Sequence, residues 1–125
     1  MNIFLLVGIG IVLLFVLCIR RSRKPSKIVQ SLSPVDRRFI ADQIEPITEL
    51  PLVTIEDELA WLVATRAAME RLGARFSEVA SVVPGPVYQY FDDADIHRKE
   101  PSHRAASETR VREFIRLLRQ EPAKT

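Results

Sequence analysis

Residues 3–19, IFLLVGIGIVLLFVLCI, are seventeen consecutive uncharged residues, and fourteen of them are Ile, Leu, Val or Phe. On an insertion scale of about −0.3 to −0.6 kcal/mol for each such residue, the stretch favours the bilayer by roughly 4 to 8 kcal/mol. A helix of this length spans roughly 25 Å, slightly less than the ~30 Å hydrocarbon core of a bilayer. The sequence therefore predicts a transmembrane helix over residues 1–19.

Five basic residues follow the apolar stretch at once, and none precedes it. By the positive-inside rule, the N-terminus is expected outside and residues 20–125 in the cytoplasm, on a single-pass protein of the cell (inner or plasma) membrane. A Lys or Arg near an anionic leaflet contributes about 1 kcal/mol of attraction. We therefore expect headgroup contacts from Arg20, Arg21, Arg23, Lys24 and Lys27.

A cleaved signal peptide is the main alternative for the apolar stretch. It would need basic residues before the stretch and an A-x-A-like cleavage site, and the sequence around Cys18 offers no such site. Cys18 is the only cysteine, so an intramolecular disulfide is excluded. We expect this thiol to lie in lipid, with acylation next to the basic residues as the alternative.

Charge is distributed unevenly behind the net value of +2. Residues 20–27 carry five Lys or Arg and no acid, residues 28–96 carry five Lys or Arg against twelve Asp or Glu, and residues 97–125 carry eight against four. The order is basic, acidic, basic. Because an acidic block separates the basic residues and the C-terminal block lacks interleaved aromatic residues, no nucleic-acid partner is expected.

The rest of the chain predicts an all-α, membrane-proximal domain of about three helices. Residues 20–33 are polar, contain Pro25 and lack apolar periodicity, which is typical of a linker. A helical cytoplasmic domain is expected over residues 34–125.

The first expected helix begins at Pro34. Ser33 is a good N-cap, and proline fits the first helical position. An apolar stripe follows, and Pro46 should end the helix, so that residues 45–53 form an extended connector. The stripe consists of Val35, Phe39, Ile40 and Ile44.

The longest helix is expected over residues 54–83. Thr54 is a cap followed by three acidic residues in the first turn, and Pro84 should stop the helix. Apolar residues recur every seven positions, so this row can pack within an antiparallel set of three helices or form a contact face for another chain. Trp61 lies one residue off this row, either at the edge of the core or as an anchor for a partner. The expected partner contacts are Ile55, Leu59, Trp61, Leu62, Met69, Leu72 and Phe76.

Residues 87–101 are expected to form a loop with an aromatic cluster, and the last helix is expected over residues 103–120. Its apolar face consists of Val111, Phe114, Ile115 and Leu118. Arginines cover the remaining surface, so this helix could lie on an anionic membrane or dock on the acidic long helix of its own chain. The matching charge signs favour docking within the chain.

Catalytic, cofactor and metal sites are not expected. The pattern of Asp92, Asp93, Asp95 and His97 could hold a hard cation, but it lacks the glycine and distal Glu of an EF-hand loop. No phosphate-binding glycine loop and no nucleophile–histidine pattern is present in the sequence. A solvated acidic loop is the favoured interpretation.

The layout favours a non-enzymatic accessory or scaffold subunit that docks to a membrane protein complex through its helical tail. Its expected partners are membrane lipid and either other subunits of such a complex or further copies of itself. The alternative is a module that binds or senses anionic lipid through residues 20–27 and the basic C-terminal helix. No specific family is indicated by the sequence.

Overall fold

A computed structural model of the chain describes residues 24–120, and every regular element in that range is helical, with no strand. The all-α prediction is confirmed for this part of the molecule. Within it, no helix combines the length and apolar character needed to cross a membrane. The span expected over residues 1–19 lies outside the described residues.

Six α-helices and one 3-10 turn make up the described part of the chain. α3, α4 and α7 are long and correspond to the three helices that the sequence predicts, whereas the others are short. The bounds are α2 Pro25–Gln30, α3 Pro34–Thr48, α4 Ile55–Arg75, η1 Val79–Ser81, α5 Gly85–Asp92, α6 Ala94–Lys99 and α7 Pro101–Arg119.

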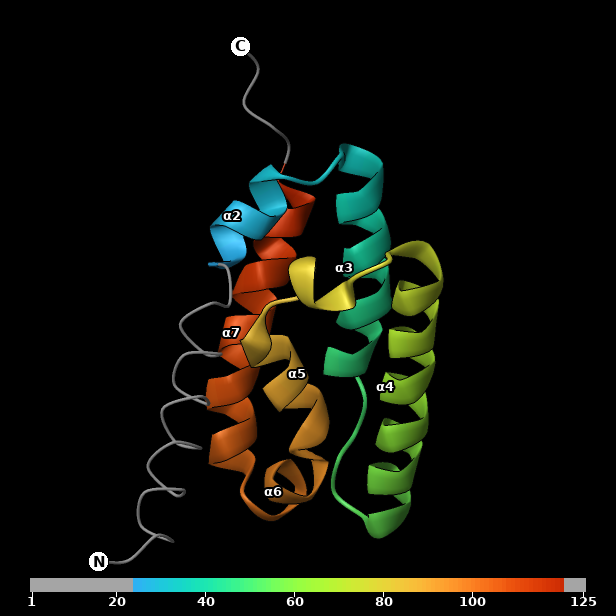
Figure 1. Cartoon of the computed structure of the whole chain (residues 1–125). Coiled ribbons are helices and arrows are strands. Elements are labelled where there is room, and N and C mark those ends of the chain that lie inside the picture. The colour runs from blue at the N-terminus through green and yellow to red at the C-terminus, as the bar shows by residue number, and fades with distance from the viewer. Residues whose placement is uncertain (1–23, 121–125) are drawn as a thin grey trace, which may run out of the picture.

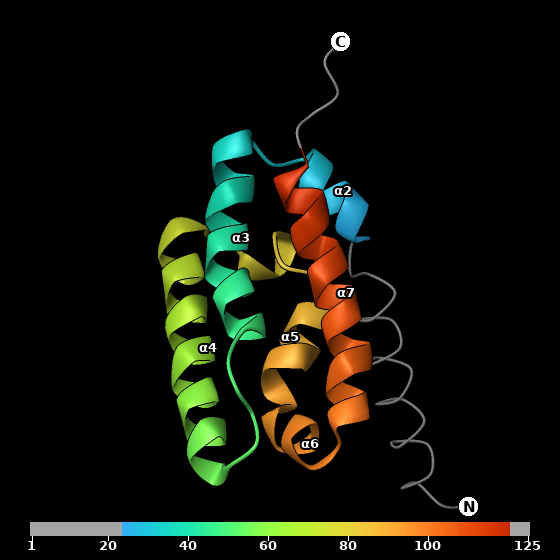
Figure 2. The same cartoon turned by 180° about the vertical axis from the view of Figure 1, so that it is seen from behind.

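α3 lies between α4 and α7 and packs against both (Figure 1). α7 also packs against α2, α5 and α6, so it is the common support of the short helices. The view from behind places α4 and α7 at opposite edges of the bundle, as in the front view (Figure 2). One face of α4 is therefore not covered by α3.

α2 occupies part of the segment that was expected to be a linker. Pro25 stands at the start of this helix, and the side chains of Ile28 and Val29 are only 1% and 6% exposed. Arg37 fixes the turn after α2 by donating from Nε to the carbonyl of Val29 at 2.9 Å. The linker prediction is wrong here because two apolar residues suffice to bury a one-turn helix, while the segment is too short to show periodicity.

α3 begins as predicted and ends later. The Ser33 hydroxyl oxygen accepts a hydrogen bond from the Asp36 backbone N–H, which confirms the cap. The helix continues through Pro46 to Thr48, so the connector begins at Glu49 rather than residue 45. A proline in the last turn removes only one backbone hydrogen bond, and burial of the side chains that follow it compensates for that loss.

α4 begins at the predicted residue and ends about two turns early. Thr54 and Asp57 form a reciprocal capping box. The chain leaves the helix at Phe76, whose backbone is extended. This change places the Phe76 ring edge-on against Phe39, with a centroid separation of 6.2 Å. α4 therefore ends before Pro84, at the residue whose ring packs on Phe39.

The face that α4 buries differs from the heptad row in the sequence. The buried side chains are Trp61, Thr65, Ala68 and Leu72. Their spacing of four, three and four residues is typical of a helix face against a core. Two of the four are Thr and Ala, so this row is less apolar in composition than the exposed one.

Residues 87–101 were expected to form a loop or a short extended piece, but most of them belong to α5, Gly85–Asp92, and α6, Ala94–Lys99. Pro86 stands in the first turn of α5, where proline is favoured. α7 agrees with its predicted extent to within two residues at its start, and all four residues of its predicted apolar face are buried: Val111, Phe114, Ile115 and Leu118.

Candidate protein-docking surface on helix α4

The first half of α4 presents apolar side chains to solvent. The exposed fractions are 64% for Ile55, 59% for Leu59, 45% for Leu62 and 70% for Val63. Val53, just before the helix, is 78% exposed. Single exposed apolar residues are ordinary, whereas a contiguous set marks a contact site. We call Val53, Ile55, Leu59, Leu62 and Val63 the α4 patch.

The structure divides the seven predicted partner contacts into two groups. Ile55, Leu59 and Leu62 lie in the α4 patch, and Met69 and Phe76 are half-buried. Trp61 and Leu72 are 0% exposed, so neither can touch a partner on this folded chain. Of the two interpretations considered for Trp61, the partner anchor is wrong, and the position in the core is confirmed, because the side chain belongs to the main hydrophobic cluster.

A groove runs along the α4 patch toward α5. It has a volume of ≈ 940 Å³, and its second wall consists of Tyr88 and Phe91 from α5. Arg66, Glu70 and Asp92 are the charged residues along it. Sequence reasoning missed this wall because it treated residues 87–101 as a loop.

Two sequence signals could have identified the second wall. Pro86 is typical of a first helical turn. Val87, Tyr90 and Phe91 then follow at helical spacing and are all buried. Together these features predict a short helix at α5.

A hydrogen bond joins α4 and α5, the two helices that wall the groove. The indole Nε1 of Trp61 donates to the carbonyl of Phe91 at 3.1 Å. The Trp61 ring also meets Tyr90 edge-on, with a centroid separation of 5.1 Å. α4 and α5 therefore keep a defined spacing, so the groove is a preformed feature of the fold.

Arg104 of α7 ties this region to the connector between α3 and α4. Its guanidinium donates to the carbonyl of Leu50 at 2.7 Å and to that of Thr48 at 3.3 Å. The same group lies 5.3 Å from the centroid of the Trp61 ring, a cation–π arrangement. One arginine thus satisfies two carbonyls at the end of α3 and packs on the core tryptophan.

Behind the groove lies a buried polar cluster. The Tyr90 hydroxyl donates to Glu108 Oε1 at 2.7 Å, and burial raises the pKa of Tyr90 far above its ordinary value. His97 is 1% exposed, and its Nε2 donates to the Tyr90 carbonyl at 2.9 Å. Within the described residues His97 Nδ1 has no hydrogen-bond partner. A neutral imidazole with its proton on Nε2 fits these contacts, and burial lowers the pKa of His97.

Acid is expected to destabilise the fold through His97. In the unfolded chain this group binds a proton near its ordinary pKa of 6.5, whereas in the folded chain it does so only at lower pH. Protonation therefore favours unfolding, and the free energy of unfolding should fall as the pH drops through 6.5 toward the lower pKa of the folded state. Urea unfolding, followed by the fluorescence of the single tryptophan, measures this dependence.

Two histidine variants make the pH test specific. His97→Phe should lose much of the pH dependence in this range, whereas His103→Gln should retain it. His103 is a matched control, since its ring lies 5.1 Å from His97 but its side chain is 38% exposed. An unchanged slope in His97→Phe would contradict the assignment.

The acidic motif of α5 and α6 does not converge. Asp92 and Asp95 are exposed, while His97 is directed into the core. Asp93 Oδ2 pairs instead with His103 Nε2 at 3.2 Å. Nowhere within residues 24–120 do three His, Cys, Asp or Glu side chains come together as a metal site would require.

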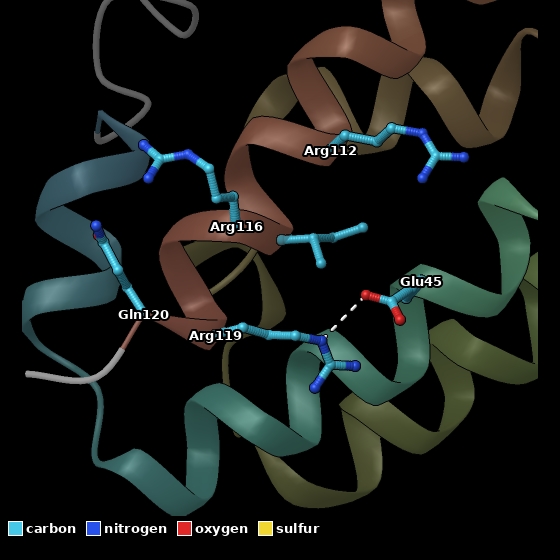
Figure 3. A pocket seen from close by; sticks show the side chains of 6 residues that line it. Glu45, Arg112, Arg116, Arg119 and Gln120 are labelled. Carbon is cyan, nitrogen blue, oxygen red and sulfur yellow. Dashed lines mark hydrogen bonds and ion pairs between the residues drawn. The ribbon is translucent and has the colours of Figure 1, made fainter.

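Some arginines of α7 pair with acidic residues on or just after α3, and the others pair with Glu108 or Glu113 of α7 itself. Arg119 Nε lies 3.0 Å from Glu45 Oε2, and its NH2 group lies 3.0 Å from Asp42 Oδ1. The dashed line in Figure 3 marks the contact with Glu45. Arg112 faces Glu49 at 3.6 Å. Docking of α7 within its own chain is confirmed, but the acidic partner is α3, not the long helix α4. These pairs line shallow, open pockets at the surface, not an enclosed site.

The predicted headgroup contacts are only partly described. Lys24 and Lys27 are both exposed beside α2, while Arg20, Arg21 and Arg23 lie outside the described residues.

Comparison with protein-family models, with curated proteins and with solved structures finds no match to this chain. The geometry of the α4 patch and its groove is therefore the basis for assigning a function.

Proposed function

We propose that this chain is a single-pass, membrane-anchored accessory or scaffold subunit, without catalysis of its own, that assembles with a membrane protein complex through its helical tail. The α4 patch is the observation that carries the proposal. It joins five exposed apolar residues to a preformed groove on an otherwise well-packed domain. Such a surface is typical of a helix-binding site.

The membrane anchor in the proposal rests on residues 3–19 and the basic residues that follow them. We place the N-terminus outside and the helical domain in the cytoplasm. After alkaline carbonate washing, the full-length chain should stay with the membrane fraction. A tag at Thr125 should become accessible to a labelling reagent only after the membrane is permeabilised. Release by carbonate, or a tag accessible from outside, would contradict the anchor.

Assembly is tested with matched exposed variants. Leu62→Glu places a charge in the α4 patch and should weaken assembly by about 2–3 kcal/mol, because a buried charge replaces buried apolar area. Val35→Glu is the control, since Val35 is 66% exposed on α3, outside the patch and the groove. The measurement is the mass of the full-length chain purified in mild detergent, together with any stoichiometric partners.

The expected result is a defined assembly for the natural chain and Val35→Glu, and its loss in Leu62→Glu. Circular dichroism should show the same helix content in all three. A monomer without partners in the natural chain would overturn the proposal.

Lipid binding by α7 is the less favoured alternative. Most of its arginines are engaged by carboxylates or backbone carbonyls of the same domain, which leaves fewer of them available to phosphate groups. Weak binding of anionic vesicles by a chain with residues 20–27 neutralised would agree with this ranking. Strong binding by that variant at low salt would favour the alternative.

A further inference from the structure

We infer that the occupant of the α4 patch is the α4 helix of a second copy of this chain, packed antiparallel to the first. The inference rests on the proposed function and deepens it, because it assigns the partner at this face. The two-fold axis passes between Ala60 and Trp61. Four observations on the described residues support this arrangement.

The first observation is the symmetry of the exposed row. Ile55, Leu59, Leu62 and Arg66 are separated by four, three and four residues, a spacing that reads the same in both directions. When two such helices lie antiparallel about this axis, Leu59 of each copy faces Leu62 of the other. This spacing permits a two-fold interface, in which each residue of the row meets its symmetry mate.

The second observation concerns charged residues of α4 that form no ion pair within the described chain. Asp57 is used in the capping box, Glu58 pairs with Arg98 at 2.7 Å and Arg75 pairs with Asp36 at 2.9 Å. Among residues 24–120, no ion pair involves Glu56 or Arg66, and both are exposed.

The proposed register gives these two charges a partner. Arg66 of one copy lies opposite Ile55 of the other, next to Glu56 of that copy. The arginine stem can cover Ile55 while its guanidinium reaches the carboxylate. Because the interface is two-fold, this pair forms twice.

The third observation concerns the groove. In the same register, Val53 and Ile55 of the second copy lie at the level of residues 66–69 of the first, where Met69 and Tyr88 line the groove. The exposed residues before and at the start of one α4 thus fill the hollow beside the other. This would cover Val53, which is 78% exposed on the single chain.

The fourth observation is the position of α4 relative to α2, where the described chain begins. The described chain begins at Lys24, directly before α2, which packs on α7. Figures 1 and 2 both place α4 at the opposite edge of the bundle from α7. A second copy can therefore approach α4 without meeting the segment that leads to the proposed anchor.

A charge-swap experiment tests the register with the full-length chain in detergent. Glu56→Arg and Arg66→Glu should each weaken self-association about tenfold, because each creates two like-charge contacts per dimer. The double variant should return the affinity to within about twofold of the natural chain. Self-association is measured by fluorescence energy transfer between two differently labelled preparations across a dilution series.

Glu78→Arg is the matched control. Glu78 is exposed and lies in neither the α4 patch nor the groove, so reversing its charge should leave the affinity unaltered. Rescue by the double variant depends on contact between the two copies, since a different partner protein would not carry the compensating charge.

Each remaining outcome is decisive. Two weakened single variants without rescue in the double variant would overturn the antiparallel α4 pair while leaving a scaffold that binds another protein. Absence of energy transfer in the natural chain, with stoichiometric partners still recovered, would overturn the second copy and leave the proposed function intact. A natural chain that neither self-associates nor recovers partners would overturn both.

Discussion

Trp61→Ala is expected to lower the free energy of unfolding by about 3–5 kcal/mol. The side chain is 0% exposed and touches α5, α6 and α7 through Tyr90, His97 and Arg104. Its removal leaves a cavity and also leaves the Phe91 carbonyl without its donor at 3.1 Å. Small domains have a free energy of unfolding of only about 5–15 kcal/mol, so this single change should remove a large part of it.

Trp61→Phe separates the two contributions. It keeps a ring in the core and removes the indole N–H, so we expect a loss of about 1–3 kcal/mol. Urea unfolding of the full-length chain in mild detergent, followed by circular dichroism, gives both values. A loss below about 1 kcal/mol for Trp61→Ala would contradict the central position of this residue.

Ile28→Ala is expected to lower the free energy of unfolding by about 2–5 kcal/mol. Ile28 is 1% exposed and belongs to the main hydrophobic cluster, although it lies in a helix of only six residues. The change should also detach α2 from α7, because Val29 alone buries little apolar area there. Protease cleavage between residues 24 and 33 should then become faster.

Lys27→Ala is the control for Ile28→Ala, as it alters the neighbouring exposed position in the same helix. It should change the free energy of unfolding by less than about 0.5 kcal/mol. Equal effects of the two substitutions would mean that residues 25–30 behave as the linker that the sequence predicts.

The starts of α3 and α4 were predictable because their signals are local. Ser33 and Thr54 both cap as expected, and each accepts a hydrogen bond from the backbone three residues further on. The apolar face of α7 was equally predictable, since its four residues are large, apolar and correctly spaced. Cap chemistry and strong periodicity depend on few residues, so they can be read without knowing the fold.

The orientation of α4 was not predictable in the same way. The most apolar row of this helix, including Ile55 and Leu62, faces solvent, while a row that includes Thr65 and Ala68 faces the core. Small side chains allow the close approach of other helices but contribute little hydropathy signal. The prediction assigned Trp61 and Leu72 to the same partner face as the heptad row, but both side chains are buried in the core.

The candidate surface was anticipated on one side only. Ile55, Leu59 and Leu62 were identified from the heptad row, but Tyr88 and Phe91 were not, because α5 is short and its start was read as a breaker. α4 also ends at Phe76, whose ring packs on Phe39, before the expected stop at Pro84. Short helices, and helix ends that depend on tertiary contacts, are determined by the element against which they pack. The local sequence does not reveal that element.

The early start of α2 restricts how the domain can move once the chain is anchored as we propose. Only five residues, Arg20 to Lys24, separate the predicted span from the first folded helix, and an extended chain of that length reaches at most about 18 Å. Two anchored copies would thus meet at nearly equal height above the lipid and diffuse in two dimensions. The resulting rise in effective concentration means that an interface too weak to hold in dilute solution could still be occupied in the bilayer.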